Sequence, residues 1–201
     1  MAAPPVNEHA VRFGPPRRIV IVSGPPASGK TTLARPLARH LGFALLSKDD
    51  IKESLYISMG GAPGDLDLSR RSGDAAMDLL WVLATRCPAV VIEANFRTRS
   101  LQERARVAAL DGKIVEIYCR VPLEEASRRF AERAREARHH PAHPLAEMPP
   151  ERMAEYDGPF GMSPVIEIDT TRPVDLLALV QRVSSSWTLE ESSAQAAGDL
   201  E

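Results

Sequence analysis

The sequence predicts a doubly wound α/β domain, with a parallel sheet of about five strands and helices on both faces of the sheet. Short β-branched runs alternate with longer amphipathic stretches along most of the 201 residues, which is the pattern of repeated strand and helix units. Runs such as IVIV and AVVI are apolar at every position, as expected of parallel strands covered on both sides. With 44% hydrophobic and 26% charged residues, the chain has enough apolar material for one compact domain.

Strands are predicted where β-branched and apolar residues cluster between turn signals, at residues 18–23, 43–47, 89–94, 113–119 and 165–169. Helices are predicted between them, where apolar side chains recur at helical spacing, at residues 30–41, 51–59, 68–86, 100–110, 123–138 and 174–183. In the first helix, Leu33, Leu37 and Leu41 share one face, and in the fifth helix Ala126 and Phe130 belong to such a stripe.

The organisation along the chain has four parts. Residues 1–16 are rich in proline and are predicted to be a flexible leader, and residues 17–183 form the domain. Residues 184–201 are rich in Ser, Ala and Glu and are predicted to be a mobile tail, with Trp187 as one packed anchor. Within the domain, residues 139–164 are proline-rich without a strand pattern, which predicts a lid or binding loop.

Composition excludes several classes of partner and location. A formal net charge of −2 argues against a broad cationic face for nucleic acid or anionic lipid. Cys87 and Cys119 lie beside apolar runs and not in a CxxC pattern, so we expect neither a disulfide scaffold nor a cysteine zinc site. His139, His140 and His143 lack ligand partners at zinc-finger spacing, so a solvent-exposed loop role is favoured over a metal site. Without an apolar run of about 18 residues or a signal-peptide pattern, we expect a cytoplasmic protein with no membrane span.

The residues after the first strand carry the most specific motif. They match G-x-x-x-x-G-K-[ST] between an apolar strand and a helical pattern, and with Thr32 they form the predicted nucleotide-binding set Gly24, Pro25, Pro26, Ala27, Ser28, Gly29, Lys30, Thr31 and Thr32. Backbone N–H groups of such a loop cradle phosphate oxygens, and the helix N-terminus adds partial positive charge. We therefore expect ATP as the cofactor, with Lys30 on the β- and γ-phosphates and the Thr31 hydroxyl on Mg²⁺.

Two adjacent acids, Asp49 and Asp50, follow the second predicted strand, and ligands bind at the carboxyl ends of strands in open α/β sheets. One of them can accept the proton of an attacking hydroxyl. Asp50 with Glu53 also fits a capping box for the next helix. We therefore predict Asp49 as the catalytic base and Asp50 as the cap, with the reverse assignment left open.

The third predicted strand ends in Glu93 after four apolar residues, a pattern similar to the Walker B strand with Glu in place of Asp. Glu93 is predicted to orient the Mg²⁺ water or to contact the acceptor. Asn95 and Arg97 follow at once. They are candidates for substrate binding, and the alternative that they only begin a turn stays open.

The helix predicted at 123–138 carries a pair of arginines, Arg129 and Arg133, that flank its buried stripe. Arg128 and Arg135 lie on the far face, among glutamates. Because the pair directly precedes the lid segment, we predict that Arg129 and Arg133 stabilise the charge of the transferring phosphoryl group. Structural salt bridges are the alternative role for both.

The order of these parts resembles the P-loop kinase group that includes polynucleotide 5′-kinase domains, chloramphenicol phosphotransferase, zeta-toxin kinases, and shikimate and gluconate kinases. The resemblance covers about residues 18–183 and rests on GPPASGKTTLAR, SKDDIKESL, VIEANF and ASRRFAERAREARHHPAH. It implies a kinase-type P-loop NTPase fold, a three-layer sandwich. It also implies that Lys52, where that group often has Arg, is a substrate-binding residue, and that Thr171 and Arg172 border the base of the nucleotide.

The function predicted from these residues is transfer of the γ-phosphate of Mg-ATP to a hydroxyl of a small molecule such as an antibiotic, a nucleoside or a sugar. The alternatives are a polynucleotide 5′-hydroxyl kinase, a nucleoside monophosphate kinase, and a non-catalytic nucleotide-sensing or toxin-like interaction module. Because a fold does not fix the acceptor, the sequence alone leaves its identity open.

Overall fold

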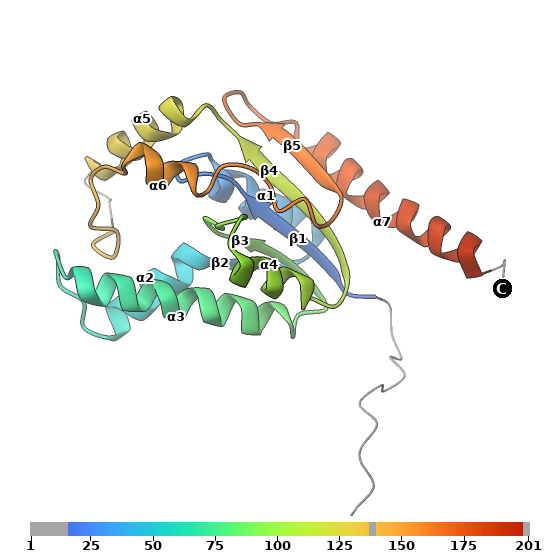
Figure 1. Ribbon diagram of the computed structural model, residues 1–201, viewed down its shortest axis with the longest axis horizontal. Coiled ribbons are helices and arrows are strands. Elements are labelled where there is room, and N and C mark those ends of the chain that lie inside the picture. The colour runs from blue at the N-terminus through green and yellow to red at the C-terminus, as the bar shows by residue number, and fades with distance from the viewer. Residues whose placement is uncertain (1–15, 137–139, 199–201) are drawn as a thin grey trace, which may run out of the picture.

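The computed structural model describes residues 16–136 and 140–198, with side chains through Thr188. A five-stranded parallel sheet lies between two helical layers (Figure 1), so the predicted α/β fold class is confirmed. The predicted leader lies almost entirely outside the described residues.

The strands are close to those predicted: β1 (Arg18–Ser23), β2 (Ala44–Ser47), β3 (Ala89–Glu93), β4 (Lys113–Arg120) and β5 (Val165–Asp169). The helices are α1 (Lys30–Leu41), α2 (Lys48–Ser58), α3 (Leu66–Ala84), α4 (Leu101–Ala108), α5 (Leu123–Ala134), α6 (Pro150–Ala154) and α7 (Leu176–Gly198). The strand order is β2-β3-β1-β4-β5, and every neighbouring pair is parallel.

The two faces of the sheet carry separate apolar cores, because successive strand side chains point to opposite sides. Val20 and Val22 of β1 belong to the core shared with α1 and α7. Ile19 and Ile21 belong to the core shared with α3 and α4. Both cores together cover residues 19–22 of β1, which explains why this part of the strand is apolar at every position.

The parallel register places the ends of three strands at one edge of the sheet. Val22 of β1 lies opposite Glu93 of β3, and Ser47 of β2 is also paired with Glu93. The segments that leave β1, β2 and β3 therefore start next to one another. This edge holds the phosphate loop, the start of α2 and the acid of β3.

Several predicted boundaries change in the structure. Helix α2 begins at Lys48, three residues before the predicted start, and α5 ends at Ala134, whereas residues 137–139 lie outside the described part. Helix α7 continues through Gly198, so a helix covers most of the stretch predicted as a mobile tail. Trp187 is buried, stacks on Phe43 at 5.7 Å between ring centroids, and so anchors α7.

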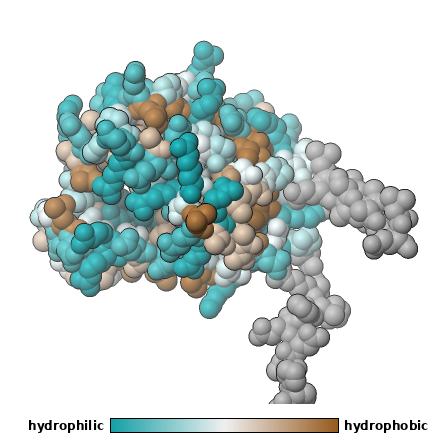
Figure 2. Space-filling model, in the orientation of Figure 1, coloured by the Kyte–Doolittle hydropathy of each residue, from teal (hydrophilic) through white to brown (hydrophobic). Residues whose placement is uncertain are grey.

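The surface facing the viewer in Figure 2 is mostly hydrophilic, with hydrophobic residues in small separate groups. Among the described residues, no helix has both the length and the apolar character needed to cross a membrane.

Candidate active site

The loop between β1 and α1 has the backbone conformation that its glycines permit. Gly24 has φ of +139°, and a Cβ at this position would lie 2.7 Å from the Cys119 carbonyl oxygen and 2.8 Å from Ser28 Oγ. Gly29 has φ of +87° and precedes α1 without a side-chain cap. The first turn of α1 therefore offers its N–H groups to an anion at this point.

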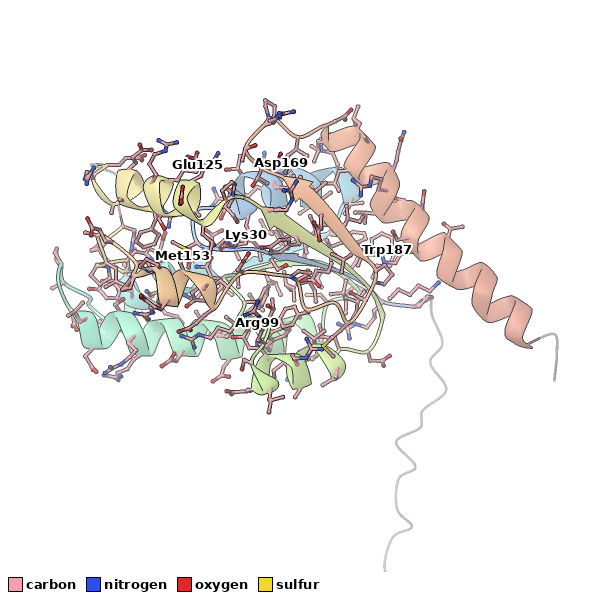
Figure 3. All side chains as sticks on the ribbon, turned by 45° about the horizontal axis from the view of Figure 1, so that its top comes forward. Lys30, Arg99, Glu125, Met153, Asp169 and Trp187 are labelled. Carbon is pink, nitrogen blue, oxygen red and sulfur yellow. The ribbon has the colours of Figure 1, made fainter. Side chains whose placement is uncertain are left out.

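Lys30, the first residue of α1, is folded back over the loop. Its Nζ donates to the Pro25 carbonyl oxygen at 2.7 Å and lies 3.5 Å from Ser28 Oγ, and only 5% of the residue is exposed. Burial lowers the pKa of Lys30, whereas the charges of Glu93 and Asp49 act in the opposite direction. Figure 3 shows Lys30 near the middle of the domain, between Glu125 and Met153 on one side and Trp187 on the other.

Glu93 ends β3 and is 3% exposed. Its Oε2 accepts a hydrogen bond from Ser47 Oγ at 2.8 Å, and Thr31, which also carries a hydroxyl, lines the same cavity. Burial raises the pKa of Glu93, whereas Lys30 and the Ser47 hydroxyl lower it. A carboxylate and a hydroxyl facing one cavity are oxygen ligands of the kind that Mg²⁺ prefers, so Thr31 and Glu93 fit the predicted metal site.

The two adjacent acids of α2 have different surroundings. Asp49 faces the cavity, and its Oδ1 lies 3.4 Å from Lys48 Nζ. Burial raises the pKa of Asp49, but the charges of Lys48, His143 and Lys30 outweigh it, and the net pKa lies below its ordinary value. Asp49 is therefore ionised near neutral pH.

Asp50 points away from the cavity and forms an exposed ion pair with Arg35 at 2.9 Å. The prediction that Asp50 caps the following helix is wrong, because α2 starts at Lys48 and its N-cap is Ser47. The capping box fails for the same reason. Its second member, Glu53, instead contacts His143 at 2.9 Å.

Both arginines predicted to contact the phosphoryl group line the cavity. Arg129 Nε donates to Glu125 Oε1 at 2.7 Å, and its Nη1 donates to the Thr170 carbonyl oxygen at 3.2 Å. The Arg133 guanidinium lies 5.7 Å from the centre of the Phe130 ring. Arg129 thus takes part in the structural ion pair that the sequence left as an alternative, while it also faces the cavity.

The cavity that joins these groups has a volume of about 280 Å³. Its lining residues come from the phosphate loop, α1, α2, the β3 end and α5: Ala27, Gly29, Lys30, Thr31, Thr32, Asp49, Glu93, Asn95, Arg129 and Arg133. Gly24, Pro25, Pro26 and Ser28 are buried in the loop behind it. Residues far apart in sequence thus meet at one polar site, as the motif order predicts.

Besides these four loop residues, four further predicted site residues lie outside the cavity lining. Lys52 is buried between α2 and α3, where its Nζ donates to Ser69 Oγ at 3.0 Å. Burial, followed by the charge of Lys48, lowers the pKa of Lys52 to about 8. Arg97 is half exposed and pairs with Glu155 at 2.9 Å.

The other two, Thr171 and Arg172, are exposed in the loop after β5. The Thr171 hydroxyl donates to Asp169 Oδ1 at 2.6 Å. Thr170, the residue before it, lies close to Gly29, because a Cβ on that glycine would be 3.8 Å from Thr170 Cβ. The loop is therefore a neighbour of the phosphate loop, which is compatible with a role at the nucleotide base.

The first described residues of the predicted lid segment pack against α2 and α3. His143 contacts Glu53, and the Ala142 carbonyl oxygen accepts from Ser69 Oγ at 2.7 Å. Ala142 is fully buried with Tyr56 and Leu68. The expected solvent-exposed role of the histidine cluster is therefore wrong for His143, whereas His139 lies outside the described residues.

The later part of the segment is attached to the sheet by side chains that the sequence patterns did not indicate. Glu116 of β4, which is fully buried, accepts from the backbone N–H groups of Phe160 at 3.0 Å and Gly161 at 3.1 Å, and from Ser23 Oγ at 2.7 Å. Tyr118 donates to Asp157 Oδ1 at 2.6 Å. A glutamate at an otherwise apolar strand position was the available signal for this anchor.

Comparisons with known proteins agree with this architecture. The family model described as "AAA domain" matches residues 19–150. A cytidylate kinase from Ignicoccus hospitalis is 31% identical over 118 residues, which are 57% of this chain and 64% of that protein. The chain thus spans slightly less than two thirds of this relative.

Solved structures are similar over a larger share of the chain. A protein from Chloroflexus aurantiacus, assigned provisionally as a kinase, is 27% identical, with a TM-score of 0.74 over 86% of this chain and 99% of its own. Shikimate kinase from Acinetobacter baumannii is 20% identical, with a TM-score of 0.54 over 87% of this chain and 94% of its own, which supports the fold alone. The chain therefore belongs to the AAA domain family and has its kinase-like P-loop fold.

Proposed function

We propose that this protein binds Mg-ATP and transfers the γ-phosphate to a hydroxyl of a small molecule such as an antibiotic, a nucleoside or a sugar. The observation that carries the proposal is the single cavity in which Lys30 and Thr31 of the phosphate loop face Asp49 of α2 and Arg133 of α5. A nucleotide site, an ionised acid and a cation are thus arranged around one space. This is the set of groups that phosphoryl transfer requires.

On the nucleotide side, the loop N–H groups and the start of α1 bind the phosphate oxygens. Lys30 moves its ammonium group from the Pro25 carbonyl oxygen to the β- and γ-phosphates, where it offsets their charge. Thr31 and Glu93 hold Mg²⁺, which when bound supplies further neutralisation of phosphate charge. Thr171 and Arg172 border the base.

On the acceptor side, Asp49 accepts the proton of the attacking hydroxyl and orients it in line with the γ-phosphate. Its lowered pKa keeps it in the form that accepts a proton. Arg129 and Arg133 stabilise the charge on the transferring group from the opposite wall. Asn95 contacts the acceptor from the β3 end, whereas the ion pair of Arg97 with Glu155 places that arginine outside the lining.

The second candidate is a nucleoside monophosphate kinase, in which the acceptor atom is a phosphate oxygen. The cytidylate kinases of Ignicoccus hospitalis and Staphylothermus marinus, 31% and 27% identical over 57% of this chain, favour it. A phosphate oxygen is already ionised near neutral pH and needs no base. The two candidates therefore differ in whether Asp49 is required for turnover.

The test is transfer of labelled γ-phosphate from ATP to a panel of nucleosides, aminoglycosides, sugars, nucleoside monophosphates and 5′-hydroxyl oligonucleotides. Labelled product from a small-molecule alcohol is the expected result. Product only from monophosphates would select the second candidate, and product only from oligonucleotides would select a polynucleotide kinase. Tight ATP binding without any transfer would favour a nucleotide-sensing module.

A further inference from the structure

A buried hydrogen bond joins the carboxyl ends of β2 and β3. Ser47 and Glu93 are register partners at the carboxyl ends of β2 and β3. Ser47 Oγ donates to Glu93 Oε2 at 2.8 Å, and each residue is only 3% exposed. The serine hydroxyl is the donor of this bond, and the carboxylate accepts it.

Ser47 makes this bond in place of the one expected from its position. It is the N-cap of α2, with an extended backbone at φ of −96° and ψ of 123°. A serine at this position ordinarily accepts a hydrogen bond from an N–H group of the first helical turn. Its side chain makes no such bond here. The hydroxyl is therefore directed toward Glu93 and not toward its own helix.

The bond holds Glu93 from a residue outside the cavity lining. Glu93 and Thr31 both line the cavity, which places the carboxylate and the Thr31 hydroxyl at one space. Ser47 itself is not among the residues that line the cavity. The buried Glu93 carboxylate is thus oriented by the hydroxyl at the end of β2.

We propose that Ser47 is a positioning residue for the magnesium site, because it holds Glu93 in the orientation in which Glu93 and Thr31 bind the ion together. This inference rests on the proposed function, which supplies the Mg-ATP. Partners of this kind, behind a metal ligand, typically change metal affinity or activity by about 10- to 100-fold when they are removed. Ser47 also directly precedes Lys48 and Asp49, so the bond connects the start of α2 to the metal side of the site.

The test measures how strongly Mg²⁺ improves ATP binding, with no acceptor and no turnover. The dissociation constant of ATP is determined by calorimetry in excess EDTA and in excess Mg²⁺, and the ratio of the two constants reports the metal site. Ser47→Ala is expected to reduce this ratio by about 10-fold or more. The constant in EDTA should stay within about twofold of the wild-type value, because the phosphate loop is unchanged.

Two further variants separate positioning from folding. Ser47→Thr keeps the donor and should restore the wild-type ratio. Ser72→Ala is the matched control, because Ser72 is also fully buried but donates within α3 to the Leu68 carbonyl oxygen at 2.7 Å. If Ser47→Ala does not fold, Ser47→Cys, a poor donor of similar size, takes its place with the same expected loss.

The outcomes distinguish this inference from the proposed function. A wild-type protein that does not bind ATP refutes both. A wild-type protein that binds ATP equally well with and without Mg²⁺ refutes the inference. A folded Ser47→Ala protein with the wild-type ratio also refutes it, as does a loss of affinity of the same size in EDTA and in Mg²⁺, because the hydroxyl would then act on the loop and not on the metal site.

Discussion

Replacing each of the two adjacent acids of α2 by its amide tests the catalytic assignment with a built-in control. Asp49→Asn removes a carboxylate that faces the cavity, whereas Asp50→Asn removes one that pairs with Arg35 on the surface. The two variants have the same change of charge and nearly the same position in the helix. They differ in what the side chain faces.

The expected magnitudes follow from these surroundings. Loss of a general base lowers kcat by about 10²- to 10⁴-fold, which corresponds to about 3–5 kcal/mol of barrier at about 1.36 kcal/mol per tenfold change in rate. Both partners of the Arg35–Asp50 pair are about half exposed, at 53% and 51% of their side chains. Such a pair contributes at most about 1 kcal/mol to the free energy of unfolding, so Asp50→Asn should change stability slightly and kcat less than twofold.

The assay is steady-state transfer to the alcohol acceptor identified by the panel, with kcat and KM determined separately and the free energy of unfolding measured in urea. ATP binding should be nearly unchanged in Asp49→Asn, since the loss belongs to the transition state. Equal kcat values for both variants would refute the assignment of Asp49 as base. A large loss in Asp50→Asn alone would move the base to Asp50, against its position on the surface.

Three further predictions concern the phosphate loop and the lid. Lys30→Ala should lower kcat by about 10²- to 10³-fold while the far-UV circular dichroism stays unchanged, and wild-type turnover would show that the loop is not a phosphate site. Gly24→Ala should lower the free energy of unfolding measured in urea by about 1–3 kcal/mol, because the φ of Gly24 is +139° and the new Cβ would lie 2.7 Å from a backbone oxygen. An unchanged midpoint of urea unfolding would contradict the loop conformation. In hydrogen exchange, amides of residues 148–156 should exchange more slowly when an ATP analogue and acceptor bind. The amides of Phe160 and Gly161, which donate to Glu116, should be protected in both states and lose protection in Glu116→Gln. Rapid exchange of these two amides in the free wild-type protein would contradict the anchor.

Local patterns in the sequence were sufficient for the sheet and for the phosphate loop. The continuous apolar runs of β1 and β3 predict parallel strands covered on both sides, and the structure has them. The loop motif is also local, since its glycines, Lys30 and Thr31 lie within eight residues, and Gly24 and Gly29 have the positive φ that glycine readily adopts. Short-range physical chemistry therefore determined these features without knowledge of the rest of the chain.

The roles of the polar residues depended on contacts between distant segments. Asp50 with Glu53 matches a capping box, but the N-cap of α2 is Ser47. The hydroxyl of Ser47 in turn donates to Glu93, 46 residues away. Glu116 reaches backbone N–H groups 44 and 45 residues further along the chain. A sequence pattern reports what a residue can do within its own helix or strand. A buried donor or carboxylate without a hydrogen-bond partner lowers the stability of the folded state, so nearly all such groups are paired. Tertiary structure decides the partner, because it determines which distant group lies within hydrogen-bond distance.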